Sequence, residues 1–88
     1  MTWKVSVKKK QLKNLNKLPL DVKQIFLALE SDLRADGPEQ PTWKNYSKLE
    51  GNKYHCHLNY HYVACWMAEK TTITIEVYYV GTREKAPY

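Results

Sequence analysis

The spacing of the apolar residues changes near Gly37 and Pro38, and this change constrains the fold more than any other feature of the chain. Before this pair, apolar side chains from residue 9 onward recur three and four residues apart, which is the period of an amphipathic helix. After it, apolar and polar residues alternate as in a half-buried strand, and the first eight residues alternate in the same way. The order of strand, helices and strands predicts an α+β fold, with two helices packed on one face of a mostly antiparallel sheet.

The first half of the chain predicts one strand and a helical hairpin. A period of two over residues 2–8 indicates the strand, and leucines three residues apart over residues 9–18 indicate a short helix that Pro19 ends. Asp21 is well placed to cap a second helix, with Gln24 three residues later completing a capping-box-like pair. The apolar stripe of that helix consists of Val22, Ile25, Phe26, Leu29 and Leu33. The Gly-Pro pair then supplies the stop.

The second half predicts a loop followed by strands. Residues 37–48 contain two prolines and no clean period, so we expect a loop with an extended end. Strands are predicted at about 53–58, 61–68 and 71–80, joined by two turns. One face of the last strand would consist of Ile73, Ile75, Val77 and Tyr79. Residues 1–88 are therefore expected to form a single domain.

Charge and composition restrict the partners of this chain. Its net charge of +5 comes from twelve lysines and only two arginines, Arg34 and Arg83, against nine acidic residues. A basic surface attracts phosphate backbones or acidic proteins, although charge alone does not choose between them. The chain has no apolar run long enough to cross a bilayer, and its first ten residues lack the apolar stretch of a signal peptide. We therefore expect a cytoplasmic protein with no membrane partner.

All three histidines of the chain lie in one predicted hairpin, the segment YHCHLNYHYVACW at residues 54–66. His55 and His57 share one face of their strand. A three-residue turn over residues 58–60 would set His57 opposite His61, whereas a two-residue turn would invert His61. The side chains expected to face the helices are Tyr62, Ala64 and Trp66. His61 then lies beside His57 on the open face of the sheet, the face without helices.

The two cysteines of the hairpin follow from the same pattern. Cys56 and Cys65 are predicted on opposite faces of the sheet, so a disulfide bond between them is not expected. Two cysteines fit a reducing compartment without proving one.

The histidine cluster allows four interpretations. The residues could be half-exposed strand positions without chemistry, or they could bind zinc, although His-x-His without a CxxC or HExxH partner is a weak metal signal. They could also perform acid–base catalysis, because imidazole titrates near neutrality, or bind phosphate passively. RNA cleavage needs a base for the 2′-hydroxyl, an acid for the departing 5′-oxygen and a cation for the phosphate. Arg83 and the loop lysines could supply that cation.

The predicted loop interleaves aromatic and basic residues, namely Trp43, Lys44, Tyr46 and Lys48. Aromatic rings stack on bases and lysines bind phosphates, so the segment suits a nucleic acid. Aromatic residues in a loop more often anchor that loop to the core. The sequence leaves both interpretations open.

The segments KLEGNKYHCHLNYHYVACW and YYVGTREKAPY, with the helix LPLDVKQIF before them, resemble toxins of the RelE/ParE superfamily, particularly the RelE type. That type typically reads K-L-x-G, a strand of tyrosine and basic residues, a turn with Y-R-V, an apolar strand, and V-G-H-R or V-G-K-R before a terminal tyrosine. The resemblance covers essentially the whole chain.

The resemblance implies a compact α+β toxin with two helices on a curved antiparallel sheet. It also implies a cognate antitoxin that wraps the toxin. RelE-like toxins are ribosome-dependent endoribonucleases that cut messenger RNA in the A site without a metal or other cofactor, so a metal site is not expected here.

The resemblance also implies roles for individual residues. His61 stands at the Y-R-V arginine, and His55 and His57 stand at basic positions of the preceding strand. Arg83 matches the VGxR arginine and Tyr88 the terminal tyrosine. The residues expected to be catalytic are His57, His61, Arg83 and Tyr88. Those expected to bind substrate are His55, Trp43, Lys44, Tyr46 and Lys48.

Histidine thus replaces the lysine and arginine of RelE itself. Arginine is a fixed cation, whereas histidine can exchange a proton. We expect His57 or His61 to act as base or acid, Arg83 to stabilise the phosphate, and Tyr88 to orient a base or hydroxyl. The leading function is therefore cleavage of translated mRNA. The alternatives are a non-catalytic, ParE-like inhibitor of DNA gyrase and a non-toxic binding domain of the same fold.

Overall fold

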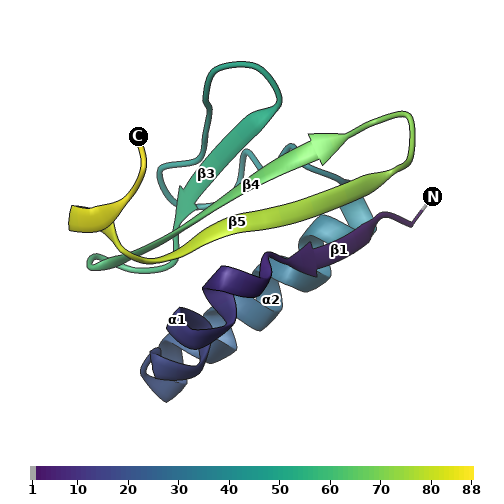
Figure 1. The fold of residues 1–88 in the computed structure, drawn as a ribbon. Coiled ribbons are helices and arrows are strands. Elements are labelled where there is room, and N and C mark those ends of the chain that lie inside the picture. The colour runs from purple at the N-terminus through teal and green to yellow at the C-terminus, as the bar shows by residue number, and fades with distance from the viewer. Residues whose placement is uncertain (1) are drawn as a thin grey trace.

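A curved five-stranded sheet carries both helices on one face in the computed structural model, which describes residues 2–88 (Figure 1). The elements are β1 (Lys4–Val7), a 3₁₀ turn η1 (Lys9–Gln11), α1 (Leu12–Lys17), α2 (Leu20–Asp36), β2 (Ser47–Lys48), β3 (Lys53–His57), β4 (Tyr62–Glu69), β5 (Thr74–Thr82) and a 3₁₀ turn η2 (Arg83–Lys85). The strand order is β1-β5-β4-β3-β2. Only the β1–β5 pair is parallel among the described residues. The predicted α+β fold with a mostly antiparallel sheet is confirmed.

The N-terminal strand lies at the edge of the sheet beside the C-terminal strand. Its alternating face, Trp3, Val5 and Val7, packs against the core as the period of two predicted. The backbone N–H of Trp3 also donates to the carbonyl of Arg34 at the end of α2, at 2.9 Å. The strand β5 thus pairs with β1 on one side and with β4 on the other, so the C-terminal strand joins the N-terminal strand to the rest of the sheet.

The apolar stripe of α2 is confirmed, but its predicted cap is wrong. Val22, Phe26, Leu29 and Leu33 are buried on that stripe. The helix begins at Leu20 with Pro19 as the capping residue and has no side-chain cap. The residue before a proline is held extended, and Leu18 has ψ 144°, so the chain turns into the helix directly after Pro19. Asp21 therefore lies inside the first turn, where a carboxylate interacts favourably with the helix dipole.

The short helix α1 is less buried than its leucine spacing predicted. Leu18 is buried and Leu15 is partly buried, but Leu12 keeps 45% of its surface exposed. Two residues of the stripe therefore attach α1 to the core.

Gly37 ends α2 as predicted and also makes room for a tryptophan. Its N–H donates to the carbonyl of Leu33 at 2.9 Å, with φ at 90°, a value that L side chains rarely adopt. A Cβ at this position would lie 2.8 Å from Nε1 of Trp3. The buried Gln40 then holds the following loop, because its Nε2 donates to the carbonyl of Gly37 at 2.9 Å.

Three aromatic rings stack between the loop and the sheet. Trp66 of β4 and Tyr54 of β3 have centroids 6.2 Å apart, and Tyr46 of the loop stacks on both at 6.4 Å. Nε1 of Trp66 donates to the carbonyl of Pro38 at 3.0 Å, so the ring is buried with its polar atom satisfied. This stack attaches the segment after α2 to the helix-covered face of the sheet.

The strand β5 starts later than its sequence predicted. Thr74 pairs with Glu69, so residues 70–73 form the turn and the strand does not begin at position 71. The hydroxyl of Thr71 donates to Oε1 of Glu69 at 3.0 Å, and hydroxyl contacts of this kind compete with strand pairing. Ile73 has φ 49° and lies in the turn, which corrects its predicted place in the strand.

A β-bulge corrects the predicted face of Tyr79. The pairing of β4 with β5 shifts between Cys65 and Trp66, which leaves Tyr78 as an extra residue. From that point the faces reverse, and Val80 rather than Tyr79 joins the buried core. The sequence does not reveal this bulge, because residues 77–80 read VYYV and are all apolar. Either set of alternating residues could therefore face the core.

Replacement of Gly37 by alanine is expected to destabilise the protein by about 3 kcal/mol, since it combines a positive φ with a clash against Trp3. Gly51 is the matched control. It also has a positive φ, 68°, but nothing lies within 4 Å of the place that a Cβ would occupy, so Gly51→Ala should cost only about 1 kcal/mol. Urea denaturation of both variants measures the difference. Equal losses would contradict the proposed clash.

Candidate functional site

The β3–β4 hairpin places the histidines, and its register differs from the predicted one by two residues, a shift that keeps each side chain on its predicted face. The N–H of Leu58 donates to the carbonyl of Tyr62 at 2.8 Å, so the tip is the three residues 59–61. His57 therefore lies opposite Val63, and the expectation that it lies opposite His61 is wrong. The cause is burial, because Leu58 and Tyr62 both pack against the core on the helix side.

The pairing otherwise confirms the predicted faces. Ala64 and Trp66 lie in the core with Cys56, while Cys65 pairs with His55 on the open face of the sheet. The two cysteines are thus on opposite faces, and both are free.

A side chain closes the hairpin tip. Oδ1 of Asn59 accepts the backbone N–H groups of His61 at 2.8 Å and of Tyr62 at 2.9 Å. The tip is also attached to the end of β5, because the N–H of Arg83 donates to the carbonyl of His61 at 2.9 Å. His61 is exposed, but both polar groups of its backbone are hydrogen-bonded, the N–H to Asn59 and the carbonyl to Arg83.

His55 lies on the open face but is covered. Only 8% of its surface is exposed, because the Tyr88 ring lies 4.3 Å from its ring centroid and the Ser47 hydroxyl lies 2.9 Å from its Nδ1. His55 therefore lies on the predicted face of the sheet, but it is not exposed there to solvent. Burial lowers its pKa below the ordinary value of 6.5, and hydrogen bonding to Ser47 acts in the opposite direction. At neutral pH this imidazole is neutral.

His57 is the half-buried neighbour of His55, with ring centroids 5.9 Å apart. The side-chain amide of Asn45 lies 3.2 Å from its Nδ1, so Nε2 is the ring nitrogen left for other partners. Desolvation is the largest cause that lowers its pKa, followed by electrostatic interaction with His55 and with the cations Arg83 and Lys44. His57 is thus a neutral imidazole held in a positive field, which is the state a general base requires.

The loop lysine Lys44 contacts this cluster through its backbone. Its carbonyl accepts the N–H of His57 at 2.8 Å. The next residue, Asn45, has φ 53°, a left-handed conformation that asparagine tolerates better than most residues. The backbone conformation of the loop at Lys44 and Asn45 therefore helps to position His57.

Tyr78 and Tyr88 lie near Cys65 on the open face. Cys65 is fully buried, and burial is the main cause that raises its pKa to about 12. The pKa of Tyr78 is also raised to about 12, by burial and by its neighbour Cys65. Tyr88 itself has a raised pKa, mainly through desolvation, and Arg83 acts against that rise. All three groups are protonated at neutral pH.

The guanidinium of Arg83 lies on an aromatic ring at the hairpin tip. Its Cζ is 4.9 Å from the ring centroid of Tyr60, and its Nη1 is 3.5 Å from the carbonyl oxygen of Tyr60. The Tyr60 ring also meets the His61 ring edge-on, at 5.0 Å. These three residues line a hollow of about 320 Å³ together with Thr82 and Glu84.

Three residues expected to bind substrate lie elsewhere. Trp43 packs against the core, and its Nε1 donates to Oδ2 of Asp32 at 2.8 Å, while Tyr46 belongs to the buried aromatic stack. Lys48 pairs with Tyr54 and extends over its ring at 5.8 Å, on the helix side of β3. The structure thus supports the anchoring interpretation of the loop aromatics and corrects the placement of these three residues.

Several residues that contact the cluster were not expected from the sequence. Ser47 and Asn45 hold the two imidazoles, Tyr60 lies against Arg83, and Tyr78 lies beside Cys65. The pairing of Ser47 with His55 could have been inferred only if the extended end of the loop had been aligned on β3.

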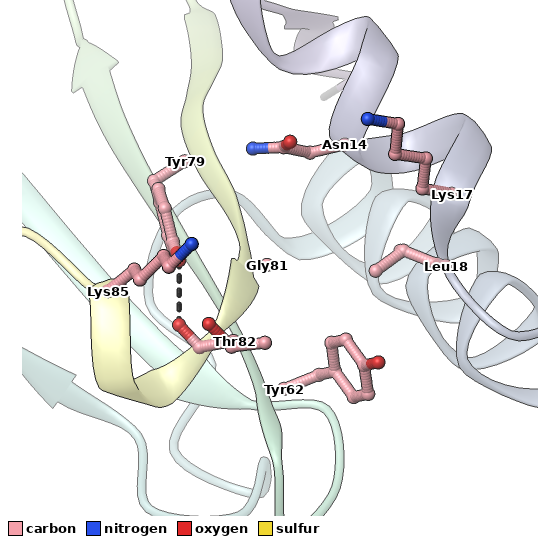
Figure 2. Close-up of a pocket in the computed structure, with 8 residues that line it drawn as sticks. All are labelled: Asn14, Lys17, Leu18, Tyr62, Tyr79, Gly81, Thr82 and Lys85. Atoms are coloured by element: carbon pink, nitrogen blue, oxygen red, sulfur yellow. Dashed lines mark hydrogen bonds between the residues drawn. The ribbon is translucent and has the colours of Figure 1, made fainter.

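A second hollow of about 220 Å³ lies apart from the imidazoles, between α1 and the end of β5 (Figure 2). Its lining residues are Asn14, Lys17, Leu18, Tyr62, Tyr79, Gly81, Thr82 and Lys85. The Tyr79 hydroxyl donates to the carbonyl of Thr82 at 2.6 Å, which folds this ring over Gly81. The hollow therefore has a polar rim with two lysines and holds none of the histidines.

Neither a metal cluster nor a membrane span is found in residues 2–88. Within this range no three or more His, Cys, Asp or Glu side chains are grouped as metal ligands. No helix in the same part of the chain has both the length and the apolar character needed to span a membrane.

Comparison with known proteins identifies the fold. No protein-family model and no curated protein sequence matches the chain. A chain of the archaeal RelE–RelB complex from Pyrococcus horikoshii OT3 superposes with a TM-score of 0.83 at 23% identity, over 98% of this chain and 100% of that one. A double arginine-to-alanine mutant of the E. coli toxin RelE in the free state gives 0.78 at 18% identity, over 98% and 88%. A metal-bound toxin from Helicobacter pylori gives 0.72 at 20% identity, over 97% and 98%.

The electrostatic coupling of His57 to Arg83 can be measured by NMR titration of the imidazole resonances. Arg83→Ala removes a nearby positive charge, so the pKa of His57 should rise toward 6.5. Lys44→Ala should move it in the same direction. His55 is the internal control, because neither cation is among the causes of its lowered pKa. A His57 pKa that stays unchanged in both variants would contradict the positive field described above.

Proposed function

We propose that this chain, which has the fold of RelE-like toxins, is the toxin of a toxin–antitoxin pair and cleaves mRNA on the ribosome without a metal. The observation that carries the proposal is the imidazole of His57 on the open face, in the positive field of Arg83 and with the ring of His55 beside it. An inhibitor that only binds another protein does not need titratable groups arranged in this way. The fold and the resemblance of the sequence supply the substrate class.

The proposed reaction uses His57 as the general base. Its lowered pKa keeps Nε2 unprotonated at neutral pH, so it can take the proton of a ribose 2′-hydroxyl. The 2′-oxygen then attacks phosphorus, and the bond from phosphorus to the 5′-oxygen breaks. The products are a 2′,3′-cyclic phosphate and a free 5′-hydroxyl.

The leaving 5′-oxygen needs a proton, and His61 is the proposed donor. It is the exposed histidine of the cluster, and its backbone carbonyl is bonded to the N–H of Arg83. Arg83 is proposed to bind the phosphate and to stabilise the negative charge that develops on it. Both proton-transfer groups are thus associated with the same cation.

The other residues of the cluster have supporting roles in this proposal. Tyr88, protonated at neutral pH and 55% exposed, can orient a hydroxyl or stack on a base. His55 is covered by Tyr88 and is proposed to fix His57 rather than to reach the substrate. Lys44 adds positive charge for the RNA backbone.

The proposed partner is a cognate antitoxin. The solved RelE–RelB complex shows that a protein of this fold assembles with an antitoxin. A net charge of +5 favours an acidic partner. A short acidic protein encoded beside this chain, whose co-expression restores growth, would support the pairing.

Induced expression is expected to arrest growth and to cut transcripts at ribosomes, as mapped by primer extension. His57→Ala and His61→Ala should each lower the cleavage rate by about 10²-fold or more, because each removes a proton-transfer group. Lys44→Ala should also weaken cleavage, while Lys48→Ala is the matched control, since Lys48 lies on the helix side of the sheet. Intact transcripts together with blocked gyrase supercoiling would favour a ParE-like inhibitor instead. Intact transcripts without growth arrest would favour a non-toxic binding domain.

The pH dependence of cleavage tests the base directly. Because the pKa of His57 is lowered from 6.5, the base form predominates at pH 7, and loss of this form should lower the rate as pH decreases below 6.5. The measurement is the rate of mRNA cleavage by purified toxin on ribosomes between pH 5.5 and pH 8. His57→Ala should remove this acidic limb from its residual activity. An unchanged limb in that variant would assign the titration to another group.

A further inference from the structure

We infer that Tyr60 is a positioning residue for Arg83, holding the guanidinium by its flat face so that its N–H donors remain free for an RNA phosphate. This inference rests on the proposed function, because it assigns Arg83 to the substrate phosphate. The resemblance places Tyr60 at the tyrosine of the Y-R-V turn but assigns it no role. The contacts at the hairpin tip carry the inference.

The two side chains are in direct contact. Cζ of Arg83 lies 4.9 Å from the ring centroid of Tyr60, inside the range of about 6 Å over which a cation is attracted to an aromatic face. The bond from Nη1 of Arg83 to the carbonyl of Tyr60 is long, at 3.5 Å, so it takes little from the donor capacity of the guanidinium.

No carboxylate in the described part of the chain lies within salt-bridge distance of this guanidinium, although Glu84 lines the same hollow. Within residues 2–88, the one salt bridge joins Arg34 to Glu30 on α2, and Arg83 has none. A carboxylate would occupy the edge of the guanidinium and neutralise it, whereas a ring contacts its face. Arginine has five N–H donors in a planar fork, so an arginine held by its face can still bind a phosphate with two parallel hydrogen bonds.

The segment that carries Tyr60 is held by its backbone. Asn59 accepts two backbone N–H groups of the tip, and the carbonyl of His61 accepts the N–H of Arg83. Both partners are therefore fixed at the backbone before their side chains meet. The ring of His61, 5.0 Å from that of Tyr60 at an interplanar angle of 86°, adds an edge-on contact that supports the tyrosine.

A different role for Tyr60 must be separated from this one. Its side chain is 66% exposed and lines a hollow of about 320 Å³, so it could instead stack directly on an RNA base. The two roles differ in one respect. A positioning residue acts only through Arg83, whereas a stacking residue contributes to binding when Arg83 is absent.

The first experiment tests by NMR whether the Arg83 guanidinium lies over the Tyr60 ring when the protein is in solution. The side-chain protons of Arg83 should show upfield ring-current shifts in NMR spectra of the parent protein and of Tyr60→Phe, which keeps the ring. Tyr60→Leu should abolish those shifts. Arg83 protons at ordinary positions in the parent protein would overturn the inference, whatever the protein does to RNA.

The second experiment is a double-mutant cycle on binding of a short 2′-O-methyl oligoribonucleotide, in which the attacking hydroxyl is blocked. Tyr60→Leu should weaken binding about fivefold, Tyr60→Phe should not, and Tyr60→Leu should have no further effect in an Arg83→Ala background. Equal weakening in both backgrounds would make Tyr60 a stacking residue and overturn the inference. If the parent protein does not bind the free oligonucleotide, the cycle is measured with the same oligonucleotide bound to ribosomes. Absence of binding there would contradict the proposed function, and the ring-current result would then decide the position of Arg83 by itself.

Discussion

The pairing of Leu58 with Tyr62 at the end of the β3–β4 hairpin determines on which face of the sheet His55 and His57 lie. Both residues pack against the core, and this pairing sets the register of the strands that lead to the tip. A slip of one residue would turn His55 and His57 toward the helices and expose Tyr54 and Cys56 instead. Burial of one large apolar side chain is worth about 1.5–3 kcal/mol, so the core selects the register strongly. The packing that stabilises the fold thus also sets the face on which the imidazoles gather.

The cations on the open face, Arg83 and Lys44, form no salt bridge with a carboxylate within residues 2–88. Arg83 lies on the Tyr60 ring rather than on a carboxylate, and Lys44 is attached near His57 through its backbone. Concentrated positive charge repels itself, and the neutral state of His55 and His57 limits that repulsion. The result is a surface that keeps its attraction for a polyanion while holding groups that can accept a proton.

Periodicity predicted the elements that bury apolar area, and it failed where non-local contacts decide. The α2 stripe and the faces of β3 follow directly from spacing, because burial imposes that spacing. The bulge at Tyr78 could not be predicted, since it depends on how β4 and β5 pair and not on either sequence alone. The cover that Tyr88 forms over His55 is equally non-local. Asp21 was misplaced because the backbone restriction at Pro19 outweighed the preference of aspartate for a cap.

The choice of histidine at position 55 has a physical explanation in its surroundings. The side chain is nearly buried, with a hydroxyl at Nδ1 and a tyrosine ring over it, and no carboxylate forms a salt bridge with it within residues 2–88. An arginine there would remain charged and would need a partner, and burial of an unpaired charge costs several kcal/mol. Histidine avoids that cost by losing its proton, as the lowered pKa indicates. The presence of an imidazole at position 55 is therefore coupled to the closure of Tyr88 over the sheet, and a charged residue at this position would favour an open tail.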